Sequence, residues 1–201
     1  MNAVDKFVLG MLKNAHAKEA CIMLHARSRN LSEIMRMLPR GCKVLDVGCG
    51  LGLTGERLAR KGYSVRGIEA DKALVKGRAA MLPYPVFGAG AEKMPFADES
   101  FDVAVFAHVL HHIPRAKHAR AMRETARVLK KGGKMIIIEP KAGAVFDEVW
   151  DEAFFSKNFH GYFTPSCRYK CKTKRGARMF EINREDISSM RFNYHGRGGG
   201  R

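Results

Sequence analysis

The chain has 201 residues, 46% of them hydrophobic, which predicts one domain, or one domain with a small appendage, around a sizeable core. No stretch approaches the roughly 18 consecutive apolar residues of a membrane-spanning helix, so no membrane span is expected. The N-terminal residues lack the basic region, apolar stretch and cleavage site of a signal peptide, which favours a cytoplasmic protein.

The formal net charge of +16 is concentrated at the two ends of the chain. Residues 156–201 hold eleven Lys and Arg against three acids, and residues 1–40 hold seven against three. Basic ends around a nearly balanced centre are typical of a protein whose termini contact an anionic partner such as RNA. A solvated basic surface explains the same distribution.

The five cysteines are odd in number and scattered, which indicates free thiols. Cys167 and Cys171 have three residues between them, and no second pair completes a zinc site. No metal is therefore expected.

Residues 1–40 are expected to form two helices. The second follows helical spacing through four apolar residues and stops at Pro39: Leu31, Ile34, Met35 and Leu38. Between the helices lies a charged stretch, residues 25–29, just before the first strand. The segment is interpreted as an N-terminal helical lid over a ligand site, with a simple packing pair of helices as the alternative.

Residues 44–47 read as a buried strand that runs into alternating glycines at Gly48, Gly50 and Gly52, followed by a helix. A strand, a glycine turn and a helix let bare backbone approach a ligand closely. The spacing of Gly50, Gly52 and Gly55 also fits a dinucleotide fingerprint. Asp46 counts against that alternative, because a carboxylate at the turn would repel a pyrophosphate.

A second strand, residues 63–68, ends at Glu69, which follows Asp46 by 23 residues. An acid at the tip of this strand can accept two hydrogen bonds from a ribose diol. That role suits either nucleotide cofactor, and a plain surface acid is the alternative.

Further strands are predicted at residues 85–88, 103–107 and 135–138, with a helix over 115–130 that Gly132 and Gly133 would cap. Strands that alternate with helices predict an α/β, Rossmann-like, doubly wound fold. The expected sheet is mostly parallel, with helices on both of its faces.

Four ordered blocks carry a family resemblance, at residues 46–52, 91–102, 108–113 and 127–134. The first has the form D-x-G-x-G-x-G. Together they resemble the class I S-adenosylmethionine-dependent methyltransferases, in the branch that includes the ubiquinone and menaquinone C-methyltransferases, over residues 42–140. The resemblance implies S-adenosyl-L-methionine as the cofactor.

The resemblance also implies which residues line the cofactor site: Asp46, Gly48, Cys49, Gly50, Gly52, Glu69, Ala70, Ala91, Glu92, Ala107 and His108. Asp46 would hold the glycine turn and face the amino group of the cofactor, and Glu69 would bind the ribose. In similar sequences an Asp that accepts the adenine amino group stands where this chain has Gly90. Glu92 or backbone carbonyls would then take over that acceptor, or cofactor affinity is reduced.

Three histidines at the fourth predicted strand are candidates for a general base: His108, His111 and His112. Turn-capping or packing explains His111 and His112 equally well.

The family's sheet closes with an antiparallel hairpin, for which the sequence shows one strand, residues 191–195, and no clear partner. Either the hairpin is abbreviated or residues 178–182 pair in an unusual way. The expected organisation is a methyltransferase domain over residues 41–195 and a flexible Arg/Gly tail over 196–201.

The expected function is methyl transfer to a small-molecule acceptor. Two alternatives stay open, which are methylation of RNA or protein through the basic flanks, and a non-catalytic cofactor-binding subunit.

Overall fold

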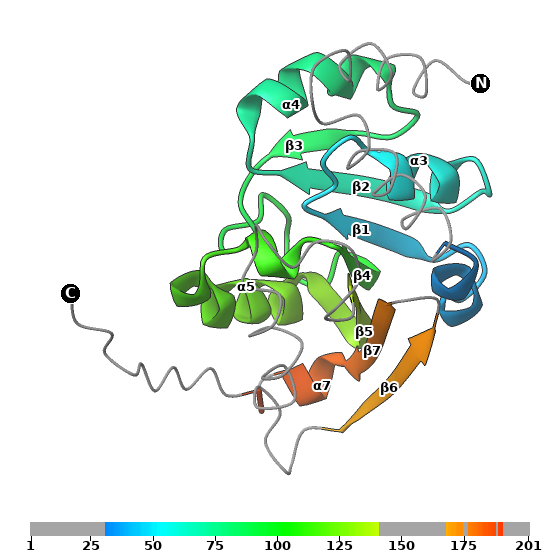
Figure 1. The fold of residues 1–201 in the computed structure, drawn as a ribbon, viewed down its shortest axis with the longest axis vertical. Coiled ribbons are helices and arrows are strands. Elements are labelled where there is room, and N and C mark those ends of the chain that lie inside the picture. Colours follow the sequence, from blue (N-terminus) through cyan, green and yellow to red (C-terminus); the bar gives the residue numbers. More distant parts are fainter. Residues whose placement is uncertain (1–30, 141–167, 175–176, 188, 191–201) are drawn as a thin grey trace.

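The computed structural model describes residues 31–140, 168–174, 177–187 and 189–190 (Figure 1). Most of the proposed lid, including the charged stretch, lies outside the described residues. The strand expected at residues 191–195 and the Arg/Gly tail lie outside them too. The assignment of a lid, a methyltransferase domain and a tail therefore stays a proposal.

The described residues form a seven-stranded sheet in the order β3-β2-β1-β4-β5-β7-β6. Neighbouring strands from β3 to β5 pair in parallel, as the sequence predicted. The strands are, in chain order, β1 (Lys43–Val47), β2 (Ser64–Glu69), β3 (Val86–Gly88), β4 (Phe101–Ala107), β5 (Leu129–Pro140), β6 (Tyr169–Lys174) and β7 (Ala177–Asn183).

The expectation of an abbreviated hairpin is wrong. β7 lies antiparallel to β5 over seven residue pairs, and β6 lies antiparallel to β7 over six. Residues 178–182 are therefore the inner strand of an ordinary hairpin, and its partner is the lysine-rich segment of β6. That segment was not recognised as a strand because its alternation of Lys with Tyr, Cys and Thr lacks an apolar stripe.

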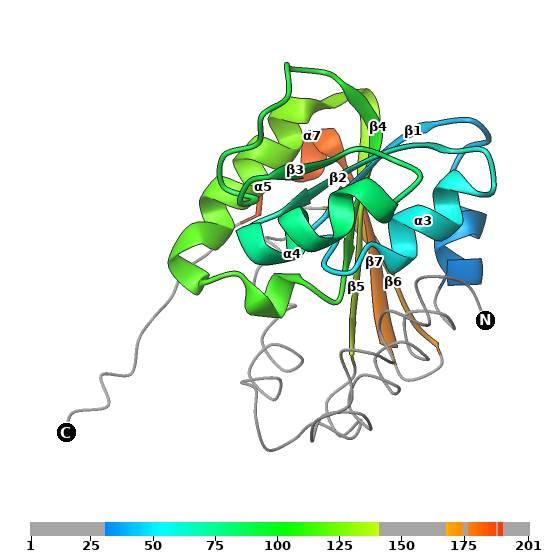
Figure 2. The same cartoon turned by 90° about the horizontal axis from the view of Figure 1, so that it is seen from above.

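Helices cover both faces of the sheet (Figure 2). On one face, α5 (Arg115–Val128) and α7 (Arg184–Ile187) share a core cluster with Leu45, Phe106 and Ile137. On the other, the helix at residues 31–37 and α3 (Leu53–Ala59) share a cluster with the neighbouring strand positions Val44, Val105 and Ile136. Alternate residues of each strand point to opposite faces, so the two helical layers fix the register of the sheet.

Short helical segments make the other connections. They are α4 (Lys72–Arg78) and η1 (Ala79–Met81) between β2 and β3, and η2 (Leu110–His112) after β4.

The helix expected over residues 115–130 ends earlier than predicted. α5 stops at Val128, and Leu129 is already extended and pairs with Phe101 of β4. Gly132 adopts a φ of +71°, but it lies within β5 and not at the helix end. The prediction that Gly132 and Gly133 cap the helix is therefore wrong. Glycine is also common where a strand is irregular, so the sequence alone does not distinguish the two cases.

A buried carboxylate connects the helix at residues 31–37 to the sheet edge. Glu33 is 1% exposed and accepts a hydrogen bond from Nζ of Lys172 on β6 at 2.9 Å, and it also pairs with Arg36. Lys170, on the same strand, is 87% exposed and lies 3.8 Å from Glu181. Lys172 therefore neutralises a buried carboxylate, whereas Lys170 forms only an exposed ion pair.

This difference predicts the effect of removing each lysine. Lys172→Met leaves a buried carboxylate with one cation less and should lower the free energy of unfolding by about 1–3 kcal/mol. The matched Lys170→Met should change it by less than about 0.5 kcal/mol, since an exposed ion pair contributes little. Urea unfolding of both variants measures the two changes in free energy. If both variants lost the same amount, the ion pair of Lys172 with Glu33 would contribute no more to stability than the exposed pair of Lys170.

Candidate functional site

The candidate site lies at the carboxyl ends of the parallel strands, where the strand order reverses between β1 and β4. In doubly wound sheets ligands bind at this switch point. The turn after β1 has left-handed backbone at three predicted positions, with φ of +62° at Gly48, +55° at Gly50 and +78° at Gly52. Glycine is the residue that adopts these angles without strain.

Two of these positions also have no room for a side chain. A Cβ on Gly48 would lie 2.1 Å from Cγ2 of Val109, in the turn after β4. A Cβ on Gly52 would lie 2.5 Å from Leu82, and the Tyr84 hydroxyl donates a hydrogen bond to the Gly52 carbonyl at 3.3 Å. The glycine turn is therefore packed closely against the loops of neighbouring strands.

Asp46 holds the start of α3. It is 2% exposed, and its Oδ2 accepts a hydrogen bond from the backbone N–H of Gly55 at 3.0 Å. Gly52, the residue before α3, has no side chain to cap that helix. A carboxylate from β1 thus satisfies an N–H group that the helix itself leaves unpaired. This hydrogen bond supports the predicted role of Asp46 in holding the glycine turn.

Glu69 joins the tip of β2 to the glycine turn. Its Oε2 accepts a hydrogen bond from the Gly50 N–H at 2.8 Å, and its Oε1 accepts one from the Asp71 N–H at 3.0 Å. The Cys49 N–H donates to the carbonyl of Ile68 at 2.9 Å. The carboxylate is half-buried, and each oxygen keeps lone pairs for further donors. Ala70 is the exposed residue that follows.

The loop after β3 lies directly beside Glu69. The Ala89 N–H donates a hydrogen bond to the Glu69 carbonyl at 2.9 Å. Ala91 is buried, and Glu92 forms an ion pair with Lys117 of α5. This hydrogen bond from Lys117 is the main cause that lowers the pKa of Glu92.

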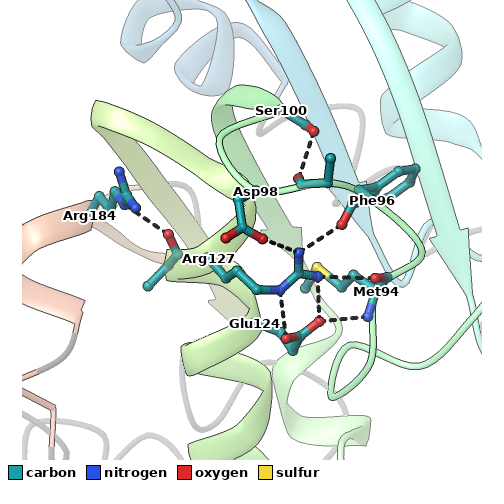
Figure 3. Close-up of polar contacts among 9 residues, drawn as sticks. Met94, Phe96, Asp98, Ser100, Glu124, Arg127 and Arg184 are labelled. Atoms are coloured by element: carbon teal, nitrogen blue, oxygen red, sulfur yellow. Dashed lines mark hydrogen bonds and ion pairs between the residues drawn. The ribbon is translucent and has the colours of Figure 1, made fainter.

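Arg127 fixes the rest of this loop to α5 (Figure 3). Its guanidinium donates to the carbonyls of Met94 and Phe96 at 3.1 and 2.8 Å, and to carboxylates of Asp98 and Glu124 at 2.8 Å each. Glu124 in turn accepts from the Met94 N–H at 2.9 Å. The planar donors of an arginine suit such a set of acceptors. Arg127 therefore positions the loop that leads from the candidate site into β4.

The ends of β4 and β5 meet at the site, and β5 brings a second buried acid to it. Ala107 is buried at the last position of the strand, and His108 follows with a φ of +55°, which is unusual for a non-glycine residue. Glu139, at the end of β5, is 3% exposed. Its Oε1 accepts hydrogen bonds from the N–H groups of Val109 and Leu110 at 3.2 and 2.8 Å.

The same carboxylate orients one of the predicted histidines. Oε2 of Glu139 contacts Nδ1 of His111, while His112 is exposed and its ring centroid lies 4.1 Å from that of His111. From α5, Nε2 of His118 contacts the carbonyls of Leu110 and Ile113 at 3.1 and 2.8 Å. The η2 turn is thus held from β5 and from α5.

The structure therefore gathers the predicted residues along one edge, through contacts that connect the glycine turn, Glu69, the loop after β3 and the turn after β4. Reasoning from the sequence missed Glu139, Tyr84 and His118. Glu139 had a usable signal, since it is an acid that ends a buried apolar strand, as Glu69 does. Tyr84 and His118 had none, because their contacts depend on tertiary packing.

Within the part of the chain that the structure describes, no group of three or more His, Cys, Asp and Glu residues is arranged to hold a metal ion. Cys171 is exposed on β6, and Cys167 lies outside that part. Among the described helices, none combines the length and the apolar character that crossing a membrane requires.

Residues 45–137 match the family model described as a methyltransferase domain. Methyltransferase GfsG of Streptomyces halstedii is 34% identical over 119 residues, covering 54% of this chain and 41% of that protein. The ubiquinone/menaquinone biosynthesis C-methyltransferase of Azotobacter vinelandii is 33% identical over 129 residues, covering 58% of this chain and 50% of that protein. The chain thus spans about half, or less, of the length of these curated relatives.

A solved protein from Pyrococcus horikoshii has a TM-score of 0.59 at 18% identity, covering 86% of this chain and 92% of that one. At this identity the likeness shows the fold alone. It extends beyond the matched family region and agrees with a sheet that closes in an antiparallel hairpin.

His118 gives the site a pH-dependent stability. Burial lowers the pKa of His118 below its ordinary value of 6.5. Below pH 6.5 the unfolded chain therefore binds more protons at this residue than the folded chain, so the free energy of unfolding should fall as the pH falls. Urea unfolding between about pH 7.5 and 5.5 measures the slope. His118→Asn should flatten this slope, whereas substitution of the exposed His112 by Asn should not. A slope that is unchanged in both variants would show that other groups cause the pH dependence.

Proposed function

We propose that this chain, whose residues 45–137 match the model of a methyltransferase domain, is a class I S-adenosylmethionine-dependent methyltransferase that transfers a methyl group to a small-molecule acceptor. The observation that carries the proposal is the Glu69 carboxylate, held at the tip of β2 against the glycine turn of β1. This arrangement offers acceptors for a ribose diol beside the glycine turn.

The described residues fit this cofactor. Gly48, Gly50 and Gly52 leave bare backbone beneath it, Glu69 would bind the ribose, and Asp46 lies at the start of the turn. Ala91 and Glu92 would lie along the adenine, and Ala107 and His108 near the amino-acid end. When bound, the cofactor supplies an electrophilic methyl group on a sulfonium.

A small-molecule acceptor is supported by the Azotobacter vinelandii relative, whose name places that relative in ubiquinone and menaquinone biosynthesis. The RNA alternative rested on the basic ends of the chain. Among the described basic residues of β6, Lys170 and Lys172 lie beside Glu181 and Glu33, and Arg168, just before the strand, pairs with Asp186. These ion pairs give the segment a structural use for its charge.

Glu139 and His111 supply a proton acceptor for this proposal. A carboxylate that faces Nδ1 keeps the proton on that nitrogen, so Nε2 is the basic nitrogen of the neutral ring. During transfer, His111 would take the proton that the acceptor's hydroxyl or carbon acid loses. Glu139 would act as a positioning residue, stabilising the imidazolium and fixing the ring.

The acceptor class is tested with S-adenosylmethionine labelled in its methyl group. The purified protein is offered a panel of quinols and phenols, bulk transfer RNA, and denatured cell protein in separate reactions. Label in the small-molecule fraction supports the proposal, and label in RNA that declines steeply with salt favours the nucleic-acid alternative. Cofactor binding without transfer to any fraction would favour a non-catalytic subunit.

Cofactor binding itself is tested at Glu69. Glu69→Ala removes the acceptor of two ribose hydrogen bonds and should lower the affinity for S-adenosylhomocysteine by about 2–4 kcal/mol, or about 30- to 1000-fold. Asp71→Ala is the matched control, because Asp71 caps α4 through the N–H of Ala73 at 2.8 Å. Calorimetry on both folded variants decides, and an unchanged affinity in Glu69→Ala would place the ribose elsewhere.

The base is tested at Glu139 and His111. Glu139→Gln and His111→Asn should each slow methyl transfer by about 100-fold or more, while changing S-adenosylhomocysteine affinity by less than about threefold. In the native protein the rate should fall on acidification, because a protonated imidazole cannot accept a proton. A rate that keeps its pH profile in His111→Asn would exclude this histidine as the base.

A further inference from the structure

Tyr84 enters the core from the short connection between η1 and β3. A proline flanks it on each side, and prolines disfavour helical backbone at the residues before them, which are Leu82 and Tyr84. The Pro85 carbonyl also accepts a hydrogen bond from the Gly67 N–H of β2 at 2.9 Å. Tyr84 is 5% exposed, so this connection anchors its ring in the interior.

Three glycines from three different elements leave the space that the Tyr84 ring occupies. A Cβ on Gly55 of α3 would lie 2.4 Å from Cζ of Tyr84, and one on Gly67 of β2 would lie 3.0 Å from Cε2. A Cβ on Gly52 in the turn would lie 3.0 Å from the hydroxyl oxygen. We call Gly52, Gly55 and Gly67 the glycine socket. A methyl group at Gly55 would force the ring to move, because the atoms that it meets belong to a rigid side chain.

The socket places the Tyr84 hydroxyl against the carbonyl of Gly52. That carbonyl accepts a hydrogen bond from the hydroxyl at 3.3 Å and one from the Glu56 N–H, in the first turn of α3, at 2.8 Å. The Gly52 N–H donates to the Cys49 carbonyl at 2.9 Å. Burial is the main cause that raises the pKa of Tyr84, so the hydroxyl keeps its proton and stays a donor at neutral pH. The N–H and the carbonyl of Gly52 are therefore both held, at the point where the turn becomes a helix.

Gly55 is the glycine of the sequence pattern to which the proposed function assigns no role. With Gly50 and Gly52 it completes the spacing of a dinucleotide fingerprint, in which the third glycine lets the helix pack closely on the strand. In this chain the space beside Gly55 is filled by the Tyr84 ring. The tyrosine thus explains the third glycine, and the spacing needs no dinucleotide.

We propose that Tyr84 is a positioning residue of the cofactor site, which holds the glycine turn through Gly52 without touching the cofactor. The inference rests on the proposed function, because it takes this turn as the backbone beneath S-adenosylmethionine. Groups that bind a ligand must be held to within about 0.5 Å by the residues packed behind them. Loosening the turn should therefore weaken cofactor binding in a protein that is still folded.

The first test removes only the hydroxyl. Tyr84→Phe keeps the ring in the socket and should weaken binding of S-adenosylhomocysteine by at least about threefold, measured by calorimetry well below the melting temperature. Ile136→Val is the matched control, because Ile136 is buried in the same core cluster but belongs to β5. It should lower the melting temperature and leave the affinity within about twofold. A Tyr84→Phe variant that binds as the native protein does would reduce Tyr84 to a packing role.

The second test asks why residue 55 is glycine. Gly55→Ala adds a methyl group that meets the ring, and should weaken binding of S-adenosylhomocysteine by at least about tenfold. Tyr84→Leu removes the ring atoms that this methyl group meets. Adding Gly55→Ala to Tyr84→Leu should therefore change the affinity by less than about twofold. A glycine needed for close approach of the ligand would instead give the same loss in both backgrounds, and the steric assignment would be wrong.

Thermal unfolding of the same variants tests the contact without any ligand. Gly55→Ala should lower the melting temperature of the native protein and change that of Tyr84→Leu much less. A Gly55→Ala protein that folds only in the Tyr84→Leu background supports the contact as well, whereas equal losses in both backgrounds contradict it.

The outcomes separate the role of Tyr84 from the proposed function. If the native protein does not bind S-adenosylhomocysteine, the proposed function is overturned. If it binds, and Tyr84→Phe binds equally well, the cofactor assignment stands and the positioning role of Tyr84 is overturned.

Discussion

The hydrogen bonds of Glu69 are the interactions on which the rest of the site depends. Its carboxylate accepts from Gly50 in the turn after β1, and its carbonyl accepts from Ala89 in the loop after β3. One residue at the end of β2 thus sets the spacing of three loops from three neighbouring strands. Residues larger than glycine do not fit at Gly48 and Gly52, because Val109 and Tyr84 already fill the space that their side chains would need.

The fold and most of the site could be read from the sequence because they depend on local patterns. The buried strand β1, the glycines after it and the acid at the tip of β2 all lie within a short segment of the sequence. In a parallel sheet the ends of β1 and β2 must then lie at the same edge. The hairpin could not be read in this way. β6 is an edge strand whose Lys residues alternate with Tyr, Cys and Thr, so it carries no apolar period. The end of α5 was missed because Leu129, the first residue of β5, continues the helical spacing of the apolar residues Met122 and Ala126.

The charge excess at the C-terminal end has a structural explanation over part of its length. Among the described strands β6 is the last of the sheet, and an edge strand presents backbone groups with which another chain can pair. Lysines on such a strand disfavour pairing with a second sheet, so their abundance needs no nucleic acid. Lys172 adds a second use, since it neutralises the buried Glu33 and fastens the helix before β1 to the far edge of the sheet.

Asp46, Glu69 and Glu139 each lie at or next to the last residue of a parallel strand, and each accepts a backbone hydrogen bond there. The protein therefore gathers three carboxylates at the carboxyl ends of its strands, within a molecule of formal charge +16. A sulfonium cofactor is net cationic, and its demethylated product is not. The positive exterior slows the approach of the cation, and the local carboxylates favour it once it arrives. Loss of the methyl group removes that attraction, so the chemistry itself would weaken the hold on the spent cofactor. Added salt would screen the exterior charges more than the buried and half-buried acids, and would therefore speed entry of the cofactor more than release of its product.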